Sequence, residues 1–402
     1  MRRLLTLLFS LVLMLAGVQQ AQAQSEVEVI DQGVSYFYGE EIDFSAHIQS
    51  TSPIQEADLY FAAEGDQNPH VFPLGLEGDN LLQYSYELTD NPLRAFASVS
   101  YWYHLVLDDG GTFDSPHYSF RYDDNRYPWQ TLQDSDVRLH WYAGDEAFGQ
   151  TAFGIARAGY QGIRSLFAVD ESEPVDIYVY ASTNDVQEAL SLGASAWIAG
   201  HASPDLGVVL LSISPGDTQD IEMERQIPHE MARVLLYRLT SPAYANLPTW
   251  LSEGLASQAE LYPNANYAQV LTLAEQNDSL LDITDLCGPF PADASGVTQA
   301  YAESDSFVRY LQSTYGSSGV QALIQAYTDG LTCDPGAARA LGSSLSQLDL
   351  QWQQNVLGSD ASGQTLANLL PYLVLFGIVL IIPVWRLGLN WKEKRQDARS
   401  KR

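Results

Sequence analysis

The chain has 402 residues, which is long enough for two domains with full hydrophobic cores and for targeting segments as well. It carries 50 Asp or Glu residues against 20 Lys or Arg residues, a formal net charge of −30. Residues 24–365 hold 11 Arg, no Lys and 48 Asp or Glu, a difference of −37, and this charge excludes nucleic acid and anionic lipid as partners of that part. Such a surface indicates either solubility in an ionic exterior or binding of calcium or a cationic ligand. The chain has no D-x-D-x-D-G loop to support calcium binding.

The first segment in chain order, residues 1–23, predicts a secretory signal peptide. Two arginines precede an apolar run over residues 4–17, and Ala-Gln-Ala at residues 21–23 forms a small-residue cleavage site. This apolar run is too short to be a membrane span. We therefore expect the chain from residue 24 onward to be exported.

Residues 24–125 predict an all-β domain, an antiparallel sandwich with an immunoglobulin-like pattern. Apolar and polar residues alternate over 42–48, 59–61 and 82–88. The segments 99–107 and 112–122 flank Asp108-Asp109-Gly110-Gly111, which is a hairpin turn signal. About seven such strands separated by turns favour a sandwich. We interpret the triplet Tyr101-Trp102-Tyr103 as packing residues rather than a ligand platform.

The second predicted domain covers residues 137–358 and follows a polar connector, residues 123–136. Its first half alternates strand and helix patterns, and from about residue 221 the chain is mainly helical. We expect strands at 137–142, 175–180 and 207–212, and helices at 147–166, 185–192, 266–276, 298–315, 320–327 and 345–356, besides two motif helices described below. A small sheet followed by helices predicts an α+β domain.

The C-terminal segment predicts a single transmembrane helix. Residues 366–385 form a run of 20 residues without a charge, which is long enough to cross a bilayer. Residues 386–402 are rich in Lys and Arg, so this tail is expected in the cytoplasm. The predicted location is the cell membrane, with a single pass, the ectodomain outside and membrane contact through residues 366–385.

The chain contains two cysteines, Cys287 and Cys333, both in the predicted exported part. An even number of cysteines in an oxidising compartment predicts a Cys287–Cys333 disulfide. Two free buried thiols are the alternative.

The sequence His229-Glu230-Met231-Ala232-Arg233 differs at one position from H-E-x-x-H, the helical zinc motif of metallopeptidases. Residues four apart lie on one face of a helix, so two histidines at this spacing can bind one metal ion. The glutamate can then act as general base toward metal-bound water. Here the second histidine is Arg233, which has no lone pair for a metal.

Glu253 lies 20 residues after Arg233, in the tract LPTWLSEGLA (residues 247–256), and AYAES follows at residues 300–304. In these features the chain resembles the gluzincins, and more narrowly the bacterial peptidase-MA-like family, over roughly residues 137–357. The resemblance implies that His229 and Glu253 are metal ligands and that Glu230 is the catalytic base. It also implies that Ser257 stands where many gluzincins carry a supporting carboxylate, and that Tyr244 or Tyr301 could stabilise an oxyanion in an active relative.

Several functions are compatible with these residues. Arg233 could replace the metal cation by pairing with Glu230 and Glu253, which gives a pseudopeptidase that binds peptide or protein outside the cytoplasm and needs no cofactor. The first alternative is an active zinc metallopeptidase with an altered ligand set, in which case zinc is the cofactor. The second is a surface adhesion or assembly protein that makes its contacts through the sandwich. A chance resemblance is the remaining possibility.

Overall fold

The structure, a computed structural model, describes residues 26–169, 173–192 and 202–358, together with Tyr372, Leu375, Phe376 and Val379. The predicted signal peptide (1–23) and basic tail (386–402) lie outside the described residues, as does most of the predicted membrane span (366–385). Within the described part of the chain, no helix is long and apolar enough to cross a membrane.

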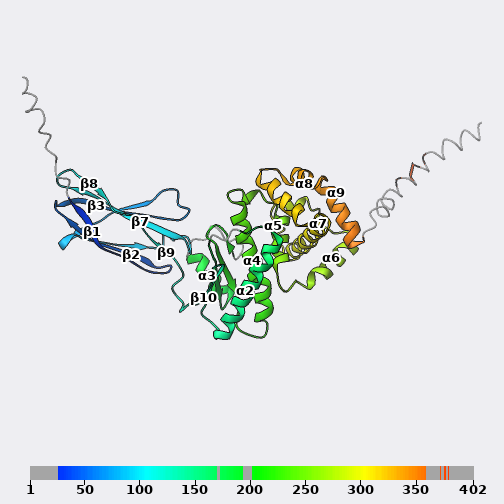
Figure 1. The fold of residues 1–402 in the computed structure, drawn as a ribbon, viewed down its shortest axis with the longest axis horizontal. Coiled ribbons are helices and arrows are strands. Elements are labelled where there is room, and N and C mark those ends of the chain that lie inside the picture. Colours follow the sequence, from blue (N-terminus) through cyan, green and yellow to red (C-terminus); the bar gives the residue numbers. More distant parts are fainter. Residues whose placement is uncertain are drawn as a thin grey trace, which may run out of the picture.

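The N-terminal part of the described chain consists of two antiparallel sheets (Figure 1). One sheet has the strand order β1-β2-β6-β5, and the other has the order β4-β3-β7-β8 with β9 also paired to β7. The strands are Val27–Phe37 (β1), Glu41–Ser50 (β2), Ile54–Ala63 (β3), His70–Pro73 (β4), Leu76–Glu77 (β5), Leu81–Glu87 (β6), Ser98–Leu107 (β7), Thr112–Asp114 (β8) and Tyr118–Arg121 (β9).

Alternating side chains bury one face of each sheet against the other. Along most of β2 and β7 every second residue is buried, as the period-2 pattern predicts. Phe44 of the first sheet contacts Phe61 and Tyr101 of the second, with ring centroids 5.3 and 5.2 Å apart. Tyr101 and Tyr103 are buried, whereas Trp102 faces outward and stacks on Tyr60. The packing interpretation of this triplet is therefore confirmed.

The second domain is built on a mixed sheet with the strand order β10-β11-β12-β14-β13. Its three central strands are parallel, and both edge strands are antiparallel to their neighbours. All six residues of β12 are buried, because both faces of this strand are covered. The strands are Gln130–Gln133 (β10), Val137–Trp141 (β11), Val175–Tyr180 (β12), Ala202–Ser203 (β13) and Val208–Ser212 (β14).

Helices form the rest of this domain and end at the far side of the molecule from the sandwich (Figure 1). Helix α7 contains a break at Gly316, which has a φ of 70°, so the sequence prediction of two helices separated near this residue is correct. The helices are Glu146–Leu166 (α2), Thr183–Leu192 (α3), Gln219–Thr240 (α4), Thr249–Ala259 (α5), Asn266–Gln276 (α6), Ala294–Thr328 (α7), Cys333–Leu341 (α8) and Leu345–Trp352 (α9), with short turns Gly78–Asn80 (η1), Tyr244–Asn246 (η2), Asp285–Cys287 (η3) and Gln353–Leu357 (η4).

The two faces of the central sheet belong to two different cores. Ile177 and Val179 point into the core shared with α2, α4 and the later helices. Tyr178 and Tyr180 of the same strand join the sandwich core, together with buried residues of α3. Phe96 of the sandwich contacts Tyr178 with ring centroids 4.5 Å apart. The sandwich core therefore continues across the junction onto one face of the sheet of the second domain.

Ion pairs flank this junction. Arg94 of the sandwich binds Asp205 at 2.6 Å, and Arg121 binds Asp176 of β12 at 3.0 Å. Asp176 is nearly buried and also accepts from Arg138 at 2.8 Å. These contacts join the sandwich to the second domain by polar as well as apolar interactions.

Several elements were not predicted from the sequence, among them β1, β10 and α8. The regular alternation of β1 is broken by a register shift between Val29 and Asp31. Strand β10 lies in the segment interpreted as a polar connector, because an edge strand with one inward apolar residue, Leu132, gives a weak signal. Helix α8 contains Pro335 and Gly336, which usually interrupt helices. The predicted order of a β-rich region followed by a helical domain is confirmed.

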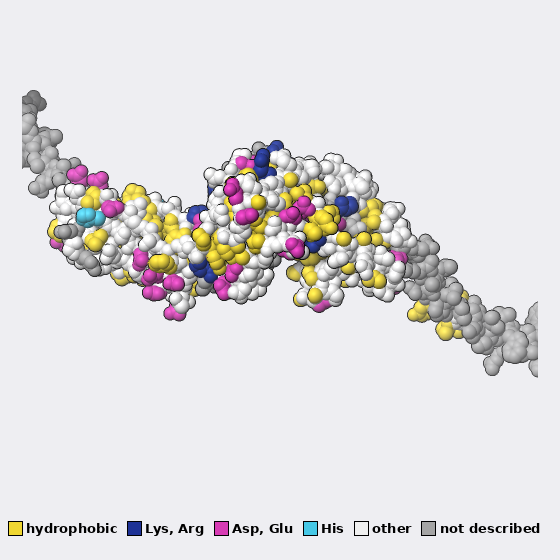
Figure 2. Space-filling view, turned by 90° about the horizontal axis from the view of Figure 1, so that it is seen from below, with side chains coloured by type: hydrophobic (Ala, Val, Ile, Leu, Met, Phe, Trp, Pro, Cys, Tyr) yellow, Lys and Arg dark blue, Asp and Glu magenta, His cyan; other side chains and the backbone are white. Residues whose placement is uncertain are grey.

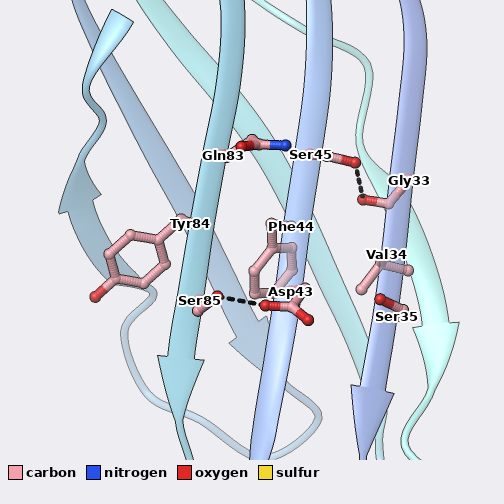
Figure 3. A pocket seen from close by; sticks show the side chains of 9 residues that line it. All are labelled: Gly33, Val34, Ser35, Asp43, Phe44, Ser45, Gln83, Tyr84 and Ser85. Carbon is pink, nitrogen blue, oxygen red and sulfur yellow. Dashed lines mark hydrogen bonds between the residues drawn. The ribbon is translucent and has the colours of Figure 1, made fainter. Parts of the chain in front are cut away.

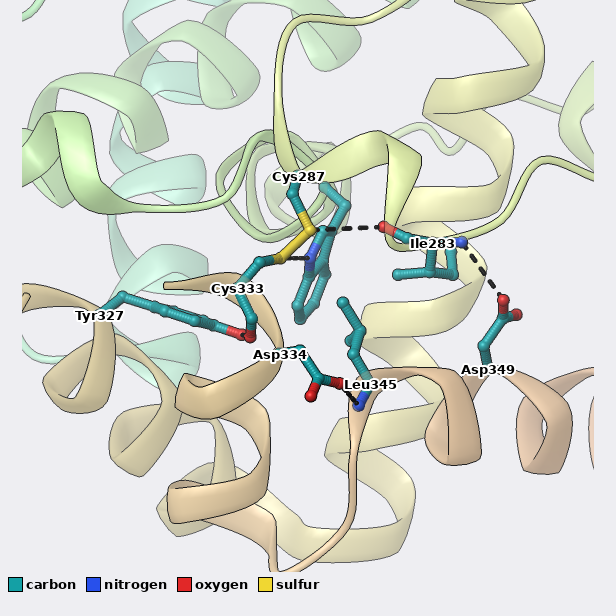
Figure 4. Close-up of a disulfide and its surroundings, with 8 residues drawn as sticks. Ile283, Cys287, Tyr327, Cys333, Asp334, Leu345 and Asp349 are labelled. Atoms are coloured by element: carbon teal, nitrogen blue, oxygen red, sulfur yellow. Dashed lines mark hydrogen bonds between the residues drawn. A yellow bond between two sulfur atoms is a disulfide. The ribbon is translucent and has the colours of Figure 1, made fainter. Parts of the chain in front are cut away.

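The predicted disulfide between Cys287 and Cys333 is present (Figure 4). It joins η3 to the first residue of α8, with Cα atoms 6.1 Å apart across a sequence separation of 46 residues. The indole Nε1 of Trp250 donates to the Cys333 sulfur at 3.4 Å, and the Tyr327 hydroxyl donates to the Cys333 carbonyl at 2.9 Å. The bond therefore ties α5, α7 and α8 to the segment that precedes α7.

Two buried carboxyl groups hold the backbone between α6 and η3. Glu303 of α7 is fully buried and accepts from the Leu281 N–H at 3.1 Å and from Gln299 at 2.7 Å. Asp349 of α9 accepts from the Ile283 N–H at 3.2 Å, and the labelled side chain points at this backbone in Figure 4. Burial raises the pKa of Glu303 to about 7 and the pKa of Asp349 to about 6.

The pKa values of Glu303 and Asp349 predict that the contribution of these two groups to stability falls as pH rises. The folded protein keeps protons on Glu303 and Asp349 that the unfolded chain releases near pH 4, so their stabilising contribution is present at low pH. It is lost as pH rises from about 4 to 7. We expect Glu303→Gln to make the melting temperature depend less on pH over this range than in the wild type. Glu56→Gln, at an exposed position of β3, is the matched control and should leave the slope unchanged; equal slopes for all three proteins would contradict the prediction.

Candidate functional site

Helices α4 and α5 bring the motif residues together. His229 and Arg233 are one turn apart on α4 and share a face. Glu253 lies on α5, which packs closely against α7 at Gly254. A Cβ on this residue would lie 2.6 Å from the Ser304 carbonyl oxygen, so the close approach requires glycine. Pro228 lies inside α4, nine residues from its start, where it packs on Gly159 of α2.

His229 is held between two carboxylates. Its Nε2 lies 3.3 Å from Glu253 Oε2, and its Nδ1 lies 3.0 Å from Glu260 Oε1. Burial lowers the pKa of His229, but the hydrogen bonds to Glu253 and Glu260 and the charge of Glu230 outweigh this effect and raise the pKa to about 10. The imidazole is therefore a cation that donates from both nitrogens at neutral pH.

Arg233 lies between the two glutamates named by the family resemblance. Its guanidinium binds Glu230 at 3.3 Å and approaches Glu253 at 3.6 Å. The pKa of Arg233 is raised, since the charges of Glu230 and Glu253 outweigh burial, so the charge is permanent. The pKa of Glu253 is lowered, because the hydrogen bond from His229 and the charge of Arg233 outweigh its burial. The expected pairing of Arg233 with both glutamates is thus present.

Together these side chains form a chain of alternating charges between α4 and α5. The first link, between Arg225 and Glu260, measures 4.0 Å, and the remaining links are those given above. Three cations face three carboxylates, so the cluster, which is nearly buried except at Arg225, is neutral without a metal ion. Its order is Arg225, Glu260, His229, Glu253, Arg233 and Glu230.

The structure corrects one expectation about this cluster. Ser257 was expected to leave the histidine without a supporting carboxylate. Glu260, at the end of α5, binds the His229 ring instead and takes that role. It lies seven residues, or two helical turns, after Glu253, so the helix periodicity was a signal for it. Arg225, one turn before His229, could have been found in the same way.

Two tyrosines approach the cluster from other elements. Tyr301 of α7 has its ring centroid 6.1 Å from that of His229, and the charge of Arg233 acts on Tyr244 of η2. Burial raises the pKa of both phenols, so both keep their protons. Each can donate a hydrogen bond at neutral pH, which is what an oxyanion-binding group requires.

The donor set does not fit a zinc ion. Catalytic zinc sites normally have three protein ligands, and the motif here supplies His229 and Glu253. The third position holds the Arg233 guanidinium, which is a cation without a lone pair. Glu260 binds the opposite nitrogen of the imidazole, so it cannot share a metal with Nε2. Among the described residues, no group of three or more His, Cys, Asp or Glu side chains is placed to hold a metal ion.

Three solved structures match a short part of the chain at low sequence identity. A family 56 carbohydrate-binding module that binds β-1,3-glucan is 13% identical over 24% of this chain and 99% of its own, with a TM-score of 0.18. OgpA from Akkermansia muciniphila is 19% identical over 26% of this chain and 30% of its own, with a TM-score of 0.21. A family 64 β-1,3-glucanase from Paenibacillus barengoltzii is 12% identical over 29% of this chain and 27% of its own, with a TM-score of 0.17. These scores are too low to support a conclusion.

Comparison with curated proteins finds no match. A protein-family model matches residues 156–358, which is half of the chain and includes α4, α5 and the charge cluster between them. Its description is the peptidase MA superfamily, in agreement with the resemblance found in the motif residues. The chain therefore belongs to the peptidase MA superfamily.

Proposed function

We propose that this protein is a membrane-anchored pseudopeptidase that binds peptide or protein segments outside the cytoplasm without cutting them. The observation that carries the proposal is the position of Arg233, which pairs with Glu230 and Glu253. These are the residues that the family resemblance assigns to catalysis and metal binding. A permanent cation there offsets the carboxylate charge that a metal would otherwise neutralise.

Electrostatics support the loss of metal binding. A divalent ion next to Glu253 would lie near the Arg233 guanidinium. At an effective dielectric constant of 20, two unit charges of like sign repel by roughly 4 kcal/mol at 4 Å. A peptidase with a rearranged ligand set would have to displace Arg233 and recruit a donor from elsewhere. Within the charge cluster, Glu230 is paired with Arg233, and Glu260 binds the His229 nitrogen opposite to the one that faces Glu253.

The location and the anchor are proposed from the sequence. The signal-like N-terminus, the uncharged run over residues 366–385 and the basic tail favour export followed by retention in the membrane. The disulfide supports an oxidising compartment for the folded domains. Figure 2 shows acidic side chains scattered over one face of the molecule and fewer basic ones, which suits a partner that is neutral or cationic.

An adhesion or assembly role for the sandwich is the competing function. Deleting residues 26–122 would be a poor test of it, because the deletion would expose Tyr178 and Tyr180 to water. Surface substitutions on the sandwich avoid this problem.

The test of the proposal is to mix the purified protein with fluorescein-labelled reduced casein, which is an unstructured polypeptide. We expect the fluorescence anisotropy to rise on binding, with no cleavage fragments after prolonged incubation. Cleavage that a chelator stops, and that Glu230→Gln abolishes, would show an active peptidase instead. Neither binding nor cleavage would reject the peptide-binding part of the proposal.

A further inference from the structure

The outer face of the sheet that contains β1, β2 and β6 is hollowed into a groove (Figure 3). Its volume is about 470 Å³, within the range typical of small-molecule sites. None of the contacts described above between the sandwich and the second domain involves this groove. It is lined by Gly33, Val34, Ser35, Asp43, Phe44, Ser45, Gln83, Tyr84 and Ser85.

Small side chains in register create the groove. Ser45 lies opposite Gly33 on one side and Gln83 on the other, and these three form one row across the sheet. The next row consists of Ser35, Asp43 and Ser85. Neighbouring strands are about 4.8 Å apart and successive outward residues about 7 Å apart, so the two rows cover roughly 10 by 7 Å. A Cβ at Gly33 would meet the Ser45 hydroxyl at 3.1 Å, so the glycine keeps this row open.

The polar groups along these rows can both donate and accept hydrogen bonds. The serine hydroxyls and the Gln83 amide do both, and Asp43 accepts. Two hydrogen bonds between adjacent strands use some of them: Ser45 donates to the Gly33 carbonyl at 3.4 Å, and Ser85 donates to Asp43. Figure 3 shows these side chains spread along the strands, with the Ser45 and Ser85 hydroxyls joined to neighbours on adjacent strands. A ligand rich in hydroxyl groups would match this pattern.

An exposed aromatic side chain lies beyond one end of the groove. Phe37 is two residues after Ser35 on β1, opposite Glu41 and outside the residues that line the groove, and it is 63% exposed. An exposed phenyl face next to hydrogen-bonding groups suits a ligand that has both hydroxyl groups and an apolar C–H face, which is the chemistry of a pyranose ring. An isolated apolar ligand would leave the polar rows unpaired.

Charge decides which kind of saccharide fits. Residues 26–122 contain 17 Asp or Glu against two Arg and no Lys. Both arginines, Arg94 and Arg121, pair with carboxylates at the junction between the domains. The sandwich therefore places no Lys or Arg at the groove that could neutralise an acidic sugar, and its acidic surroundings repel anionic glycans.

We propose that this groove binds a neutral saccharide chain, with the two polar rows bonding to its hydroxyl groups and Phe37 contacting a ring face. The site is independent of the charge cluster between α4 and α5. It gives the sandwich a role that the peptidase-like domain does not supply. A basic peptide is the competing ligand, because Asp43 and the acidic surroundings would attract it.

The test is native electrophoresis of the full-length protein through gels that contain laminarin, dextran, mannan or xylan. Its net charge of −30 carries the protein into the gel, so retardation by bound polysaccharide is easily measured. We expect retardation by at least one of these neutral polymers. Ser45→Tyr, which fills the middle of the groove, should weaken the apparent affinity at least tenfold, and Gln83→Ala roughly three- to tenfold.

Ser100→Tyr is the matched control, because Ser100 faces outward on the other sheet and opposite Ala62. It should migrate as the wild type does. No retardation by any of the four polymers would overturn the proposal, and so would equal retardation of wild type and Gln83→Ala. Binding of poly-lysine at low salt that exceeds binding of every polysaccharide would identify a basic partner and also overturn it.

Discussion

Replacing Arg233 with alanine should lower the free energy of unfolding by about 3–5 kcal/mol, the usual cost of removing one partner from a buried ion pair. The Arg233 side chain is 15% exposed, and its partners Glu230 and Glu253 are 10% and 9% exposed. Without the guanidinium, both carboxylates remain nearly buried, and no opposite charge compensates the free-energy cost of their burial. Van der Waals contacts of the arginine side chain are lost as well.

Denaturant titration of wild type and variant measures this effect. Arg157→Ala is the matched control, since Arg157 is 64% exposed and pairs with Asp134 at 3.0 Å. An exposed ion pair contributes at most about 1 kcal/mol, so the control should change stability little. Arg233→Lys should fall between the two, because it restores the charge but not the fork geometry. Equal losses for Arg233→Ala and Arg157→Ala would refute the counter-charge role.

Removing the disulfide should have an effect of similar size. In the chain-entropy description, closing a loop of this length stabilises the folded state by roughly 4 kcal/mol. The Cys287–Cys333 bond spans 46 residues that include all of α7. Replacing both cysteines with alanine should therefore lower the unfolding midpoint strongly while leaving α5 and α7 packed around Trp250.

Reduction provides the control for this prediction. A thiol reductant should lower the melting temperature of the wild type to about that of the Cys287→Ala, Cys333→Ala double variant. The same reductant should leave the double variant unchanged. A wild type whose melting temperature is insensitive to complete reduction, verified by alkylation of both thiols, would contradict the predicted stabilisation.

Local periodicity explains what could be predicted from the sequence. The strand Val175–Tyr180 and the helix Asn266–Gln276 have the boundaries that their residue patterns predict. The disulfide followed from the count of two cysteines and the predicted export. The position of Arg233 on the same face as His229 followed from the helix repeat alone.

Long-range packing explains what could not be predicted. A continuous apolar strand predicts burial on both faces, yet not that Tyr178 and Tyr180 enter the core of the other domain. The helix repeat places Glu260 two turns after Glu253, but its pairing with His229 depends on how α5 ends beside α4, where the Leu261 N–H donates to the Glu224 carbonyl at 2.9 Å. The groove on β1, β2 and β6 depends on strand register, because Ser45 meets Gly33 and Gln83 only after the sheet is assembled.

Zinc binding is the most direct measure of the central claim, that Arg233 has taken the place of the metal. The full-length wild type and Arg233→His should be equilibrated with zinc, freed of excess metal by gel filtration, and analysed for zinc per protein. We predict negligible zinc in the wild type and measurable zinc in Arg233→His, which restores the second histidine one turn after His229. Stoichiometric zinc in the wild type that is lost in Glu253→Ala would contradict the account and identify a working metal site.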